Sequence, residues 1–361
     1  MLDIDLDAVA ANWRRLAALT APAECAAVVK ADAYGLGAGP VVRALAAAGC
    51  RSFYVALPDE GRAVRAAVGT GPAIGVLAGY LSDARQIYQT SDLTPVLNTP
   101  LQIDGWAAGG GGRAAFVHVD SGINRLGLGP EQWQALVTGG DLGFPLAGVL
   151  SHLACADEPD HPLNRAQLAA FRGALARLPA GTRASFANSS GIFLGGDFHF
   201  GQVRPGAALY GVNPTPGRPN PMRPAVRLRG RILQVRHIDR GQAVGYGATY
   251  IAPSARKVAT VAVGYADGLH RAASNRGSVL CQSHEAPIIG RVSMDMITID
   301  VSDIPDHAAR PDLWVDVIGP HRDVDAVAAD CGTIGYEVLT ALGRRYRRRY
   351  RGGTHDGAAG G

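Results

Sequence analysis

Lysine is nearly absent from the sequence. The chain of 361 residues holds 35 lysines and arginines, and only Lys30 and Lys257 are lysines. Arginine keeps its proton, whereas a desolvated lysine amine can lose its proton and condense with a carbonyl. Lys30 ends an apolar run, residues 25–29. It is therefore a candidate for covalent chemistry, although a lysine that caps a buried strand and keeps its head in water is the alternative.

Cysteines and long apolar runs are also scarce. The five cysteines are odd in number, dispersed and without CxxC spacing, which argues against a disulfide framework or a zinc site. The donor residues within 152–161 fit no standard metal spacing, so no metal is expected. No stretch approaches the roughly 18 apolar residues of a membrane helix, and Met1 leads into acidic residues. We expect a soluble cytoplasmic protein with no membrane partner.

The positive charge is concentrated at one end. The formal net charge is +4, and residues 344–351 alone carry six arginines, so the remainder is at −2. The body of the chain therefore gives no reason to expect a nucleic-acid partner. We interpret 344–351 as a solvated segment or charged edge and 352–361 (GGTHDGAAGG) as a disordered tail.

Strands and helices alternate through the first 200 residues. Helices are predicted from Asp7, Pro40, Pro58, Ser82, Thr99 and about Pro162, the last running to Leu178. Eight strands are predicted, at 25–30, 53–56, 73–77, 93–97, 114–119, 146–150, 184–187 and 201–204. This pattern favours a (β/α)8 TIM barrel over residues 7–223; a doubly wound open sheet uses the same alternation.

Polar residues follow the C-terminal ends of several predicted strands. They are Lys30, residues 120–125, Ser151 with His152, Asn188 with Ser189, and Arg204. In a barrel these ends meet at one mouth, where the active site lies and where the last two loops commonly bind phosphate. We expect one site to collect all five groups.

The pattern changes after a proline-rich hinge at 217–224. Beyond it, period-two alternation and close turns predict a smaller, mostly β domain over 224–351, which the N-terminal strand 1–6 joins. Its expected strands are 228–238, 243–251, 257–263, 278–282, 286–301 and 313–318. Short helices are predicted at 323–330 and 335–342.

An aldehyde cofactor with a phosphate would suit Lys30, and pyridoxal phosphate is the obvious one. The segment 188–191 (NSSG) begins a predicted helix and offers hydroxyls and N–H groups to an anion, although such a segment is ordinarily only a helix cap. Gly206 and Ala207 could add backbone donors, and Tyr34 lies four residues after Lys30.

The segment VVKADAYGLG at 28–37 resembles the cofactor-lysine signature of the alanine racemases, and the similarity continues to Tyr350. The matching segments are 120–127 (DSGINRLG), 151–154 (SHLA), 187–189 (ANS), 203–206 (VRPG), 245–247 (GYG), 264–268 (GYADG), 290–295 (GRVSMD) and 332–337 (GTIGYE). The resemblance implies a barrel plus β domain. It also implies a head-to-tail homodimer whose two active sites each borrow residues from the partner's β domain.

The resemblance implies two bases, because inverting an α-carbon needs proton removal on one face and delivery on the other. Lys30 is one, and Tyr246, from the other subunit, is its opposite. A free tyrosine titrates near ~10, so forming the phenolate at pH 7 costs roughly 4 kcal/mol. Positive charge must reduce that cost. His152 and Arg204 are candidates, since the family connects the tyrosine and the histidine to the arginine at the pyridine nitrogen.

Arg204 also indicates the reaction type. An arginine cannot accept the proton of the ring nitrogen, which leaves a shallower electron sink and favours reprotonation over transamination or decarboxylation. By resemblance, Arg125 and the Met294 N–H bind the substrate carboxylate. The remaining family positions line the entrance or support the site: Tyr265, Tyr336 (which also touches the phosphate), Asp295 and His118.

His118 is a departure from the family. Many members have a lysine there that becomes carbamylated and orients the substrate-binding arginine. We hypothesise that His118, together with a bound anion, holds Arg125 instead. Ser293 and Ile123 differ more mildly from common family choices.

These residues predict pyridoxal phosphate-dependent interconversion of L- and D-alanine, supplying D-alanine for cell-wall peptidoglycan. The alternatives are a broad-spectrum amino-acid racemase on the same scaffold and a non-catalytic pyridoxal phosphate-binding protein. A full β domain with Tyr246 argues against the latter.

Overall fold

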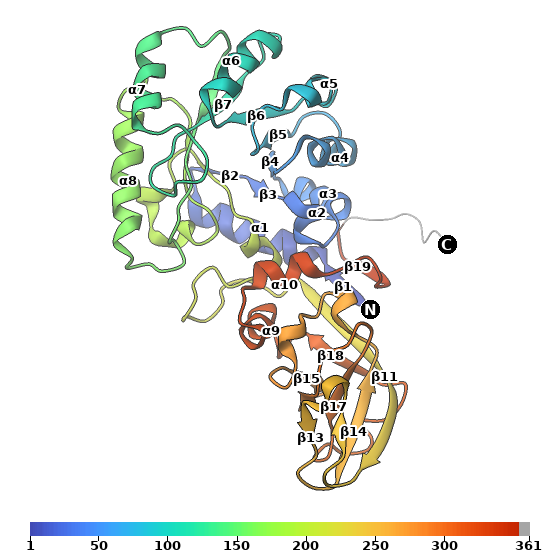
Figure 1. Ribbon diagram of the computed structural model, residues 1–361. Helices are drawn as coiled ribbons and strands as arrows, with labels where there is room; N and C mark the ends of the chain where they lie inside the picture. The colour runs from blue at the N-terminus through green and yellow to red at the C-terminus, as the bar shows by residue number, and fades with distance from the viewer. Residues whose placement is uncertain (354–361) are drawn as a thin grey trace.

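Eight short parallel strands close into a barrel that forms one end of the molecule (Figure 1). The structure is a computed structural model and describes residues 1–353. β2 (Glu24–Cys25) and β3 (Ala27–Val28) are two halves of one strand interrupted at Ala26; β2 pairs with the last barrel strand and β3 with the next. The other seven are β4 (Ser52–Val55), β5 (Ala73–Val76), β6 (Thr94–Leu97), β7 (Ala115–His118), β8 (Leu146–Leu150), β9 (Ala184–Ser185) and β10 (Gln202–Val203). The predicted barrel is confirmed.

Helices connect most of the barrel strands and cover the outside of the ring. They are α1 (Leu6–Thr20), α3 (Ala38–Ala48), α4 (Pro58–Val68), α5 (Arg85–Thr90), α6 (Pro100–Gly109), α7 (Pro130–Gly139) and α8 (Pro162–Leu175). Thr99 caps α6 as predicted, accepting from Gln102 N at 3.2 Å. Two predicted caps were wrong. Asp5, the last residue of β1, caps α1 in place of Asp7, because the strand runs directly into the helix, and Ser82 lies inside the 3-10 helix η1 (Ser82–Ala84).

The last two barrel units lack full helices. After β9 the chain forms the 3-10 helices η2 (Gly191–Leu194) and η3 (Gly196–Phe198), and after β10 it forms η4 (Ala207–Tyr210). The helix predicted after 188–191 is therefore a single short turn. These tight turns keep backbone N–H groups near the barrel mouth.

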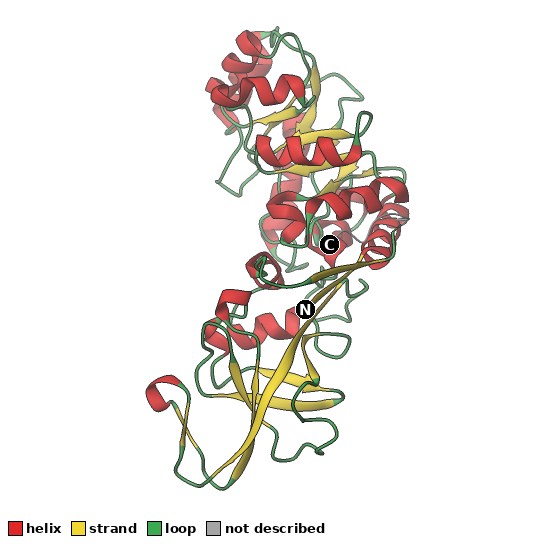
Figure 2. Cartoon of the chain, turned by 90° about the vertical axis from the view of Figure 1, so that its right-hand side faces the viewer, coloured by secondary structure: helices red, strands yellow, loops and turns green. Residues whose placement is uncertain are grey.

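The second domain is a mostly antiparallel sheet that extends away from the barrel (Figure 2). Its strands are β1 (Leu2–Asp5), β11 (Val226–Ile238), β14 (Arg256–Val261), β15 (Ser278–Cys281), β16 (His284–Ile289), β17 (Ile297–Asp300), β18 (Trp314–Ile318) and β19 (Arg348–Arg351). Because β14 pairs with both β17 and β11, six of these strands form a ring.

Two predicted strands are each two elements. Residues 243–251 form a hairpin of β12 (Ala243–Val244) and β13 (Tyr250–Ile251), with Tyr246 in the 3-10 turn η5 (Tyr246–Ala248) between them. Residues 286–301 divide at Gly290, whose φ of +75° turns the chain into a loop that carries Met294. Both divisions place family-matched residues on loops.

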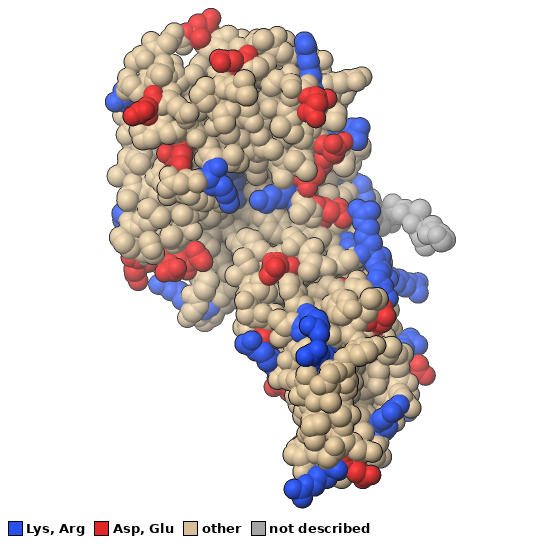
Figure 3. Space-filling model, in the orientation of Figure 1, with Lys and Arg blue, Asp and Glu red and all other residues tan. Residues whose placement is uncertain are grey.

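The two ends of the chain meet in this sheet. β1 pairs antiparallel with β11 and parallel with β19. The 344–351 segment, predicted as a solvated segment or charged edge, is thus partly an edge strand: Arg349 and Arg229 bind Asp3 at 2.5 and 2.7 Å. Burial acts to raise the pKa of Asp3, but these arginines hold it below its ordinary value. Basic side chains follow the edge that β19 forms (Figure 3). The predicted tail lies, from residue 354 on, outside the described residues.

The helices α9 (Val324–Cys331) and α10 (Gly335–Ala341) join the sheet to the barrel mouth. Asn213 N donates to Asp325 Oδ2 at 2.7 Å, and the Tyr350 hydroxyl donates to Leu36 O at 2.9 Å. These contacts bring α10 beside the segment that follows Lys30. Over residues 1–353, no helix combines the length and apolar character needed to cross a membrane.

Candidate active site

Lys30 lies at the barrel mouth, directly after β3, and is half-buried. The short element α2 (Lys30–Tyr34) is not a right-handed helix, because Ala31, Asp32, Ala33 and Tyr34 all have φ of 54–55°. Burial lowers the pKa of the Lys30 amine, and the Arg125 guanidinium lowers it further, while Glu60 opposes them. The amine is thus shifted toward its neutral, nucleophilic form.

Arg204 lies inside the barrel, 4% exposed, just after β10. Its guanidinium donates to Ser151 O at 2.6 Å and to the Ser185 hydroxyl. Burial lowers the pKa of Arg204 to about 10, so it remains charged at neutral pH. The residue is a fixed cation beneath the mouth.

His152 follows β8, and its backbone carbonyl accepts from Gln167 Nε2 at 2.9 Å. Burial lowers the pKa of His152 to about 3, with Arg204 and Arg125 adding to the shift. The imidazole is therefore neutral at pH 7. The prediction that His152 supplies positive charge was wrong, and Arg204 is the cation of this pair.

A small cradle of donors forms where the last two barrel loops meet Tyr34. The Ser189 hydroxyl accepts from Gly206 N at 3.0 Å and from Ala208 N at 3.2 Å. A Cβ on Gly206 would lie 2.3 Å from the Tyr34 hydroxyl oxygen, so glycine is required there. Tyr336 of α10 completes one side, its ring centroid 6.1 Å from that of Tyr34.

Asn188 and Ala207 belong to the same two loops. The Asn188 side chain accepts from Gly191 N at 2.9 Å, which orders the turn after Ser189. Ala207 is buried at the start of η4, directly after Gly206. The structure thus brings the predicted phosphate-binding residues together around Tyr34, within reach of the strand that carries Lys30.

Arg125 lies on the loop after β7 and is exposed. Asp120 organises this loop, because its carboxylate accepts from the backbone N–H groups of Gly122, Ile123 and Asn124 at 2.9–3.2 Å. Asp120 therefore holds the backbone of the loop that carries Arg125. Figure 3 shows a hollow between the barrel and the β domain, with basic side chains on its rim.

His118 ends β7 and points its imidazole at Asn98. The Nδ1 and Asn98 Oδ1 atoms are 2.7 Å apart, and the Asn98 amide donates to Leu77 O and Val96 O. Because both amide hydrogens are used, Oδ1 must accept and His118 Nδ1 must donate. The Nε2 lone pair is left buried and, among the described residues, has no partner.

This tautomer bears on the hypothesis about Arg125. Burial lowers the pKa of His118 to about 4, with Arg204 contributing, so the ring is neutral. Its Nε2 lone pair can accept from a donor. No hydrogen bond within residues 1–353 joins it to Arg125, so a role of His118 and a bound anion in holding Arg125 stays a prediction.

The remaining predicted residues lie on the β domain, on loops of the same chain that do not reach Lys30. Tyr246, Tyr265 and Met294 are 74%, 43% and 53% exposed. Asp295 pairs with Arg345 at 2.7 Å. In the described part of the chain, no hydrogen bond or ring contact connects Tyr246 to the barrel site.

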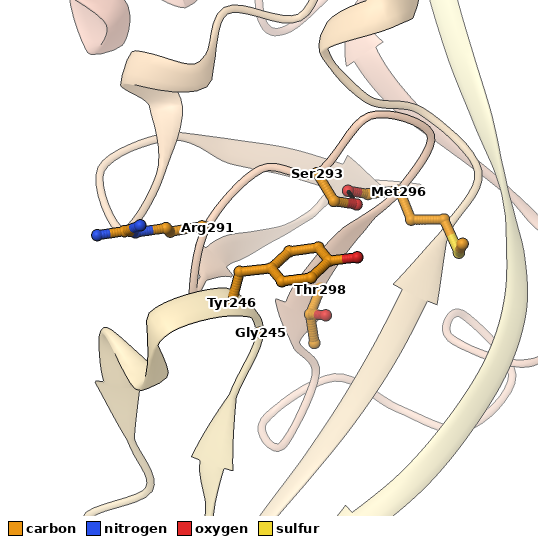
Figure 4. A pocket seen from close by; sticks show the side chains of 6 residues that line it. All are labelled: Gly245, Tyr246, Arg291, Ser293, Met296 and Thr298. Atoms are coloured by element: carbon orange, nitrogen blue, oxygen red, sulfur yellow. Dashed lines mark hydrogen bonds between the residues drawn. The ribbon is translucent and has the colours of Figure 1, made fainter.

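Tyr246 lines a cavity of about 330 Å³ on the β domain (Figure 4). The lining residues are Gly245, Tyr246, Arg291, Ser293, Met296 and Thr298. The tyrosine ring lies between Arg291 and Met296, and its hydroxyl points away from Arg291 (Figure 4). One chain therefore presents a barrel half and a separate β-domain half of the predicted site.

Sequence reasoning missed the residues that support these groups: Glu60, Asn98, Asp120 as the loop organiser, and Gln167. Only Asp120 carried a signal, an acidic residue just after a strand and before a glycine, which is typical of a turn. The other three act across elements, and no local pattern marks them.

Two family models match the chain. The model described as "Alanine racemase, N-terminal domain" matches residues 4–214, and that described as "Alanine racemase, C-terminal domain" matches residues 225–350. Together they span nearly all of the barrel and the β domain.

Relatives match over almost their whole length. A protein of Rhodospirillum rubrum named "Alanine racemase" is 52% identical over 368 residues, covering 99% of this chain and 97% of that protein. A protein of Mesorhizobium japonicum named "Alanine racemase, catabolic" is 46% identical, covering 98% of this chain and 93% of that one.

Solved structures share the fold. The alanine racemase of Bartonella henselae with covalently bound pyridoxal phosphate superimposes with a TM-score of 0.92 at 41% identity, covering 97% of this chain and 99% of that one. The biosynthetic alanine racemase of Pseudomonas aeruginosa gives a TM-score of 0.92 at 35% identity, covering 98% and 99%.

Proposed function

Because the chain belongs to the alanine racemase family, we propose that it interconverts L- and D-alanine with pyridoxal phosphate bound at Lys30. The observation that carries this proposal is the convergence of a lysine of lowered pKa, a buried arginine and a donor cradle at one barrel mouth. A carbonyl-bearing, phosphorylated cofactor uses each of these features.

The residues present fit such a cofactor. The cradle of Tyr34, Ser189, Gly206 and Ala207 would hold a phosphate, with Asn188 shaping the loop and Tyr336 adding a hydroxyl. Arg204 would face the pyridine nitrogen, and His152 would lie beside the ring. When bound, pyridoxal phosphate supplies an electron sink that acidifies the substrate α-carbon.

Two bases on opposite faces would exchange the α-proton. The Lys30 amine has a lowered pKa, so it can take a proton on one face and return it. Tyr246 of the partner subunit would serve the other face. Its exposure in one chain, beside the exposed Met294, supports a homodimer in which the β domain of one subunit completes the barrel site of the other.

Arg204 would limit the reaction to proton exchange. It keeps its proton, because burial leaves its pKa at about 10, so it could donate to the ring nitrogen but not accept a proton from it. A cofactor held in this way would supply only a shallow electron sink, and Lys30 or Tyr246 of the partner subunit would return the proton. This supports racemisation over decarboxylation.

The substrate carboxylate would bind Arg125 and the backbone N–H of Met294 of the partner subunit. Tyr336, together with Tyr265 and Asp295 of the partner subunit, would narrow the entrance. His118 would act at a distance, as a neutral residue under the mouth. A narrow entrance favours the methyl side chain of alanine over longer ones.

The product would supply D-alanine for cell-wall peptidoglycan in the cytoplasm. The catabolic relative supports a second role, in which D-alanine is converted to L-alanine for use as a nutrient. The equilibrium of a racemase lies near unity, so which direction dominates depends on supply and demand in the cell.

A D-amino-acid oxidase-coupled assay on the purified chain tests the proposal. L-alanine should yield D-alanine at a rate well above those with L-serine and L-lysine. Comparable rates with all three would indicate a broad-spectrum racemase. A protein that binds pyridoxal phosphate but converts none of them would be a non-catalytic binder.

A further inference from the structure

Glu60, in the first turn of α4, connects two barrel loops through its carboxylate. Oε2 accepts from Ala56 N at 2.8 Å and from Leu57 N at 3.1 Å, which satisfies the start of the helix. Oε1 accepts from Ala31 N at 2.6 Å. Ala31 is the residue directly after Lys30, so a helix cap also reaches the backbone of the candidate cofactor lysine.

That backbone is strained. Residues 31–34 are four consecutive non-glycine residues in the left-handed region, each with φ near 54°. This conformation is unfavourable for an L-residue and persists only where the surroundings impose it. Several bonds come from the segment itself, among them those from Gly35 N to Ala31 O, from Gly37 N to Asp32 O and from Ala38 N to the Asp32 carboxylate.

The bond to Glu60 is different because it comes from another element and reaches the first residue of the strained turn. It fixes the direction in which the chain leaves β3 and hence the direction of the Lys30 side chain. A lysine has four rotatable bonds, so the backbone from which it departs is the part that the fold can hold rigid.

The same carboxylate acts on the charge of the amine. Burial and Arg125 lower the pKa of Lys30, and Glu60 raises it. His152, on the loop after β8, is neutral at pH 7, and Tyr54 of β4 and Tyr336 of α10 have pKa values raised by burial, so they are neutral too. Asp32 lies within the turn and is bound to Ala38 N.

We propose that Glu60 is a positioning residue for Lys30. Its carboxylate, bound to Ala31 N, holds the left-handed turn behind the lysine and places a negative charge next to the lysine backbone. The proposal rests on the proposed function only in its consequence, that Lys30 must alternate between the protonated and neutral forms during turnover. The negative charge of Glu60 lets the amine regain a proton despite its burial.

The chain provides a matched set of variants. Glu60→Gln keeps the size of the side chain and one hydrogen-bond acceptor but removes the charge. Glu60→Ala removes the charge and the acceptors. Asp59→Asn is the control. Asp59 is the neighbouring carboxylate in the first turn of α4, where it pairs with Arg62 at 2.6 Å, and within residues 1–353 it makes no hydrogen bond to the turn after Lys30.

Because the chain has only two lysines, Lys257 can serve as the internal standard when the reactivity of Lys30 is measured. The full chain, freed of cofactor with hydroxylamine, is labelled with trace acetic anhydride across a pH series, and the Lys30 and Lys257 peptides are quantified by mass spectrometry. Lys257 is paired with Asp306 on the β domain, far along the chain from Glu60. The ratio of the two labels reports the Lys30 amine without any activity assay.

We expect Glu60→Gln to raise the Lys30-to-Lys257 label ratio about threefold or more at neutral pH, because losing the negative charge lowers the pKa of Lys30. Glu60→Ala should raise it similarly and also lower the thermal unfolding midpoint, while Asp59→Asn should leave the ratio unchanged. Thermal unfolding confirms that each variant is folded.

An unchanged ratio in folded Glu60→Gln would overturn the proposal. An equal rise in Asp59→Asn would also overturn it, since loss of either negative charge in the first turn of α4 would then have the same effect on Lys30. Failure of the wild-type chain to racemise alanine would refute the proposed function but would leave the label ratios, and thus the inference about Glu60, standing.

Discussion

At the barrel mouth, Arg204 is 4% exposed and already bound to two groups, whereas Tyr246 on the β domain is 74% exposed. The barrel half of the candidate site is thus built within one chain, with its cation desolvated and its donors in place. The β-domain half is a set of exposed apolar side chains, Tyr246, Tyr265, Met294 and Met296, of which Tyr246 and Met296 line a small cavity.

The difference indicates that the two halves of the site have different roles. Groups that must hold a cofactor are fixed in advance, since a preorganised site avoids reorganisation when the ligand binds. Exposed apolar groups of this kind are typical of a surface that another protein covers. The comparison can be tested by removing residues from each half in turn.

The largest effect should come from the barrel half. Lys30→Ala should lower kcat by about 10³-fold or more, because it removes both the cofactor attachment and one base. The coupled alanine assay measures this, and borohydride reduction followed by mass spectrometry should show no cofactor attached to the variant. Lys257→Ala is the control and should keep full activity; a similar loss there would refute the assignment of Lys30.

The next effect tests whether the two halves come from different chains. Tyr246→Phe should lower kcat by about 10²-fold or more, since it removes the opposing base. Mixing it with Lys30→Ala under conditions that exchange subunits should restore about a quarter of wild-type activity, because half of the dimers are mixed and each has one intact site. No recovery from a confirmed mixture would mean that Tyr246 serves the barrel of its own chain.

A smaller effect is expected in the phosphate cradle. Gly206→Ala would place a Cβ 2.3 Å from the Tyr34 hydroxyl oxygen, so the cradle must open. We expect about tenfold weaker binding of pyridoxal phosphate, measured by equilibrium titration of the cofactor-free chain. Gly196→Ala is matched, because its Cβ would meet nothing within 4 Å. Unchanged affinity of Gly206→Ala for pyridoxal phosphate would show that this cradle does not bind the phosphate.

The smallest effect concerns the buried histidine of the barrel. The pKa of His118 is about 4 in the folded chain, below its ordinary value of about 6.5, so the unfolded state takes up a proton first as pH falls. Its contribution to stability is therefore present above about pH 6.5 and is lost as the pH falls toward 4. His118→Gln should remove about 1–2 kcal/mol of the stability difference between about pH 7 and about pH 5.

Urea unfolding at both pH values measures this difference. His307→Gln, an exposed β-domain histidine, is the control. If His118→Gln keeps the full pH dependence, His118 is not the titrating group, and the contrast between a desolvated barrel and an open β domain weakens.

The barrel strands and the residues at their ends were predictable because they follow local patterns. Short segments of four to six residues, most of them mainly apolar and bounded by turn residues, predicted all eight strands, and Lys30, Ser189 and Arg204 lie at or just after the ends of those strands. The predicted strands were wrong where a local pattern continues through a turn. At 243–251 and 286–301 the alternation of apolar residues masked loops that carry Tyr246 and Met294.

Contacts between distant segments could not be predicted. The pairing of β1 with β19 joins residues more than 340 positions apart, as in the Arg349–Asp3 ion pair, so it made part of the arginine-rich segment an edge strand. The Asn98 amide, just after β6, fixes the tautomer of His118. Neither residue type reveals its partner.

The order of strands, the lysine and the arginine at two strand ends, and the family could all be recognised from residue types and short spacings. The left-handed turn after Lys30, the neutral state of His152 and the separation of Tyr246 from the barrel site of its own chain became visible only in the folded chain. Strain, desolvation and exposure are properties of what surrounds a residue, and the surroundings exist only after the chain has folded.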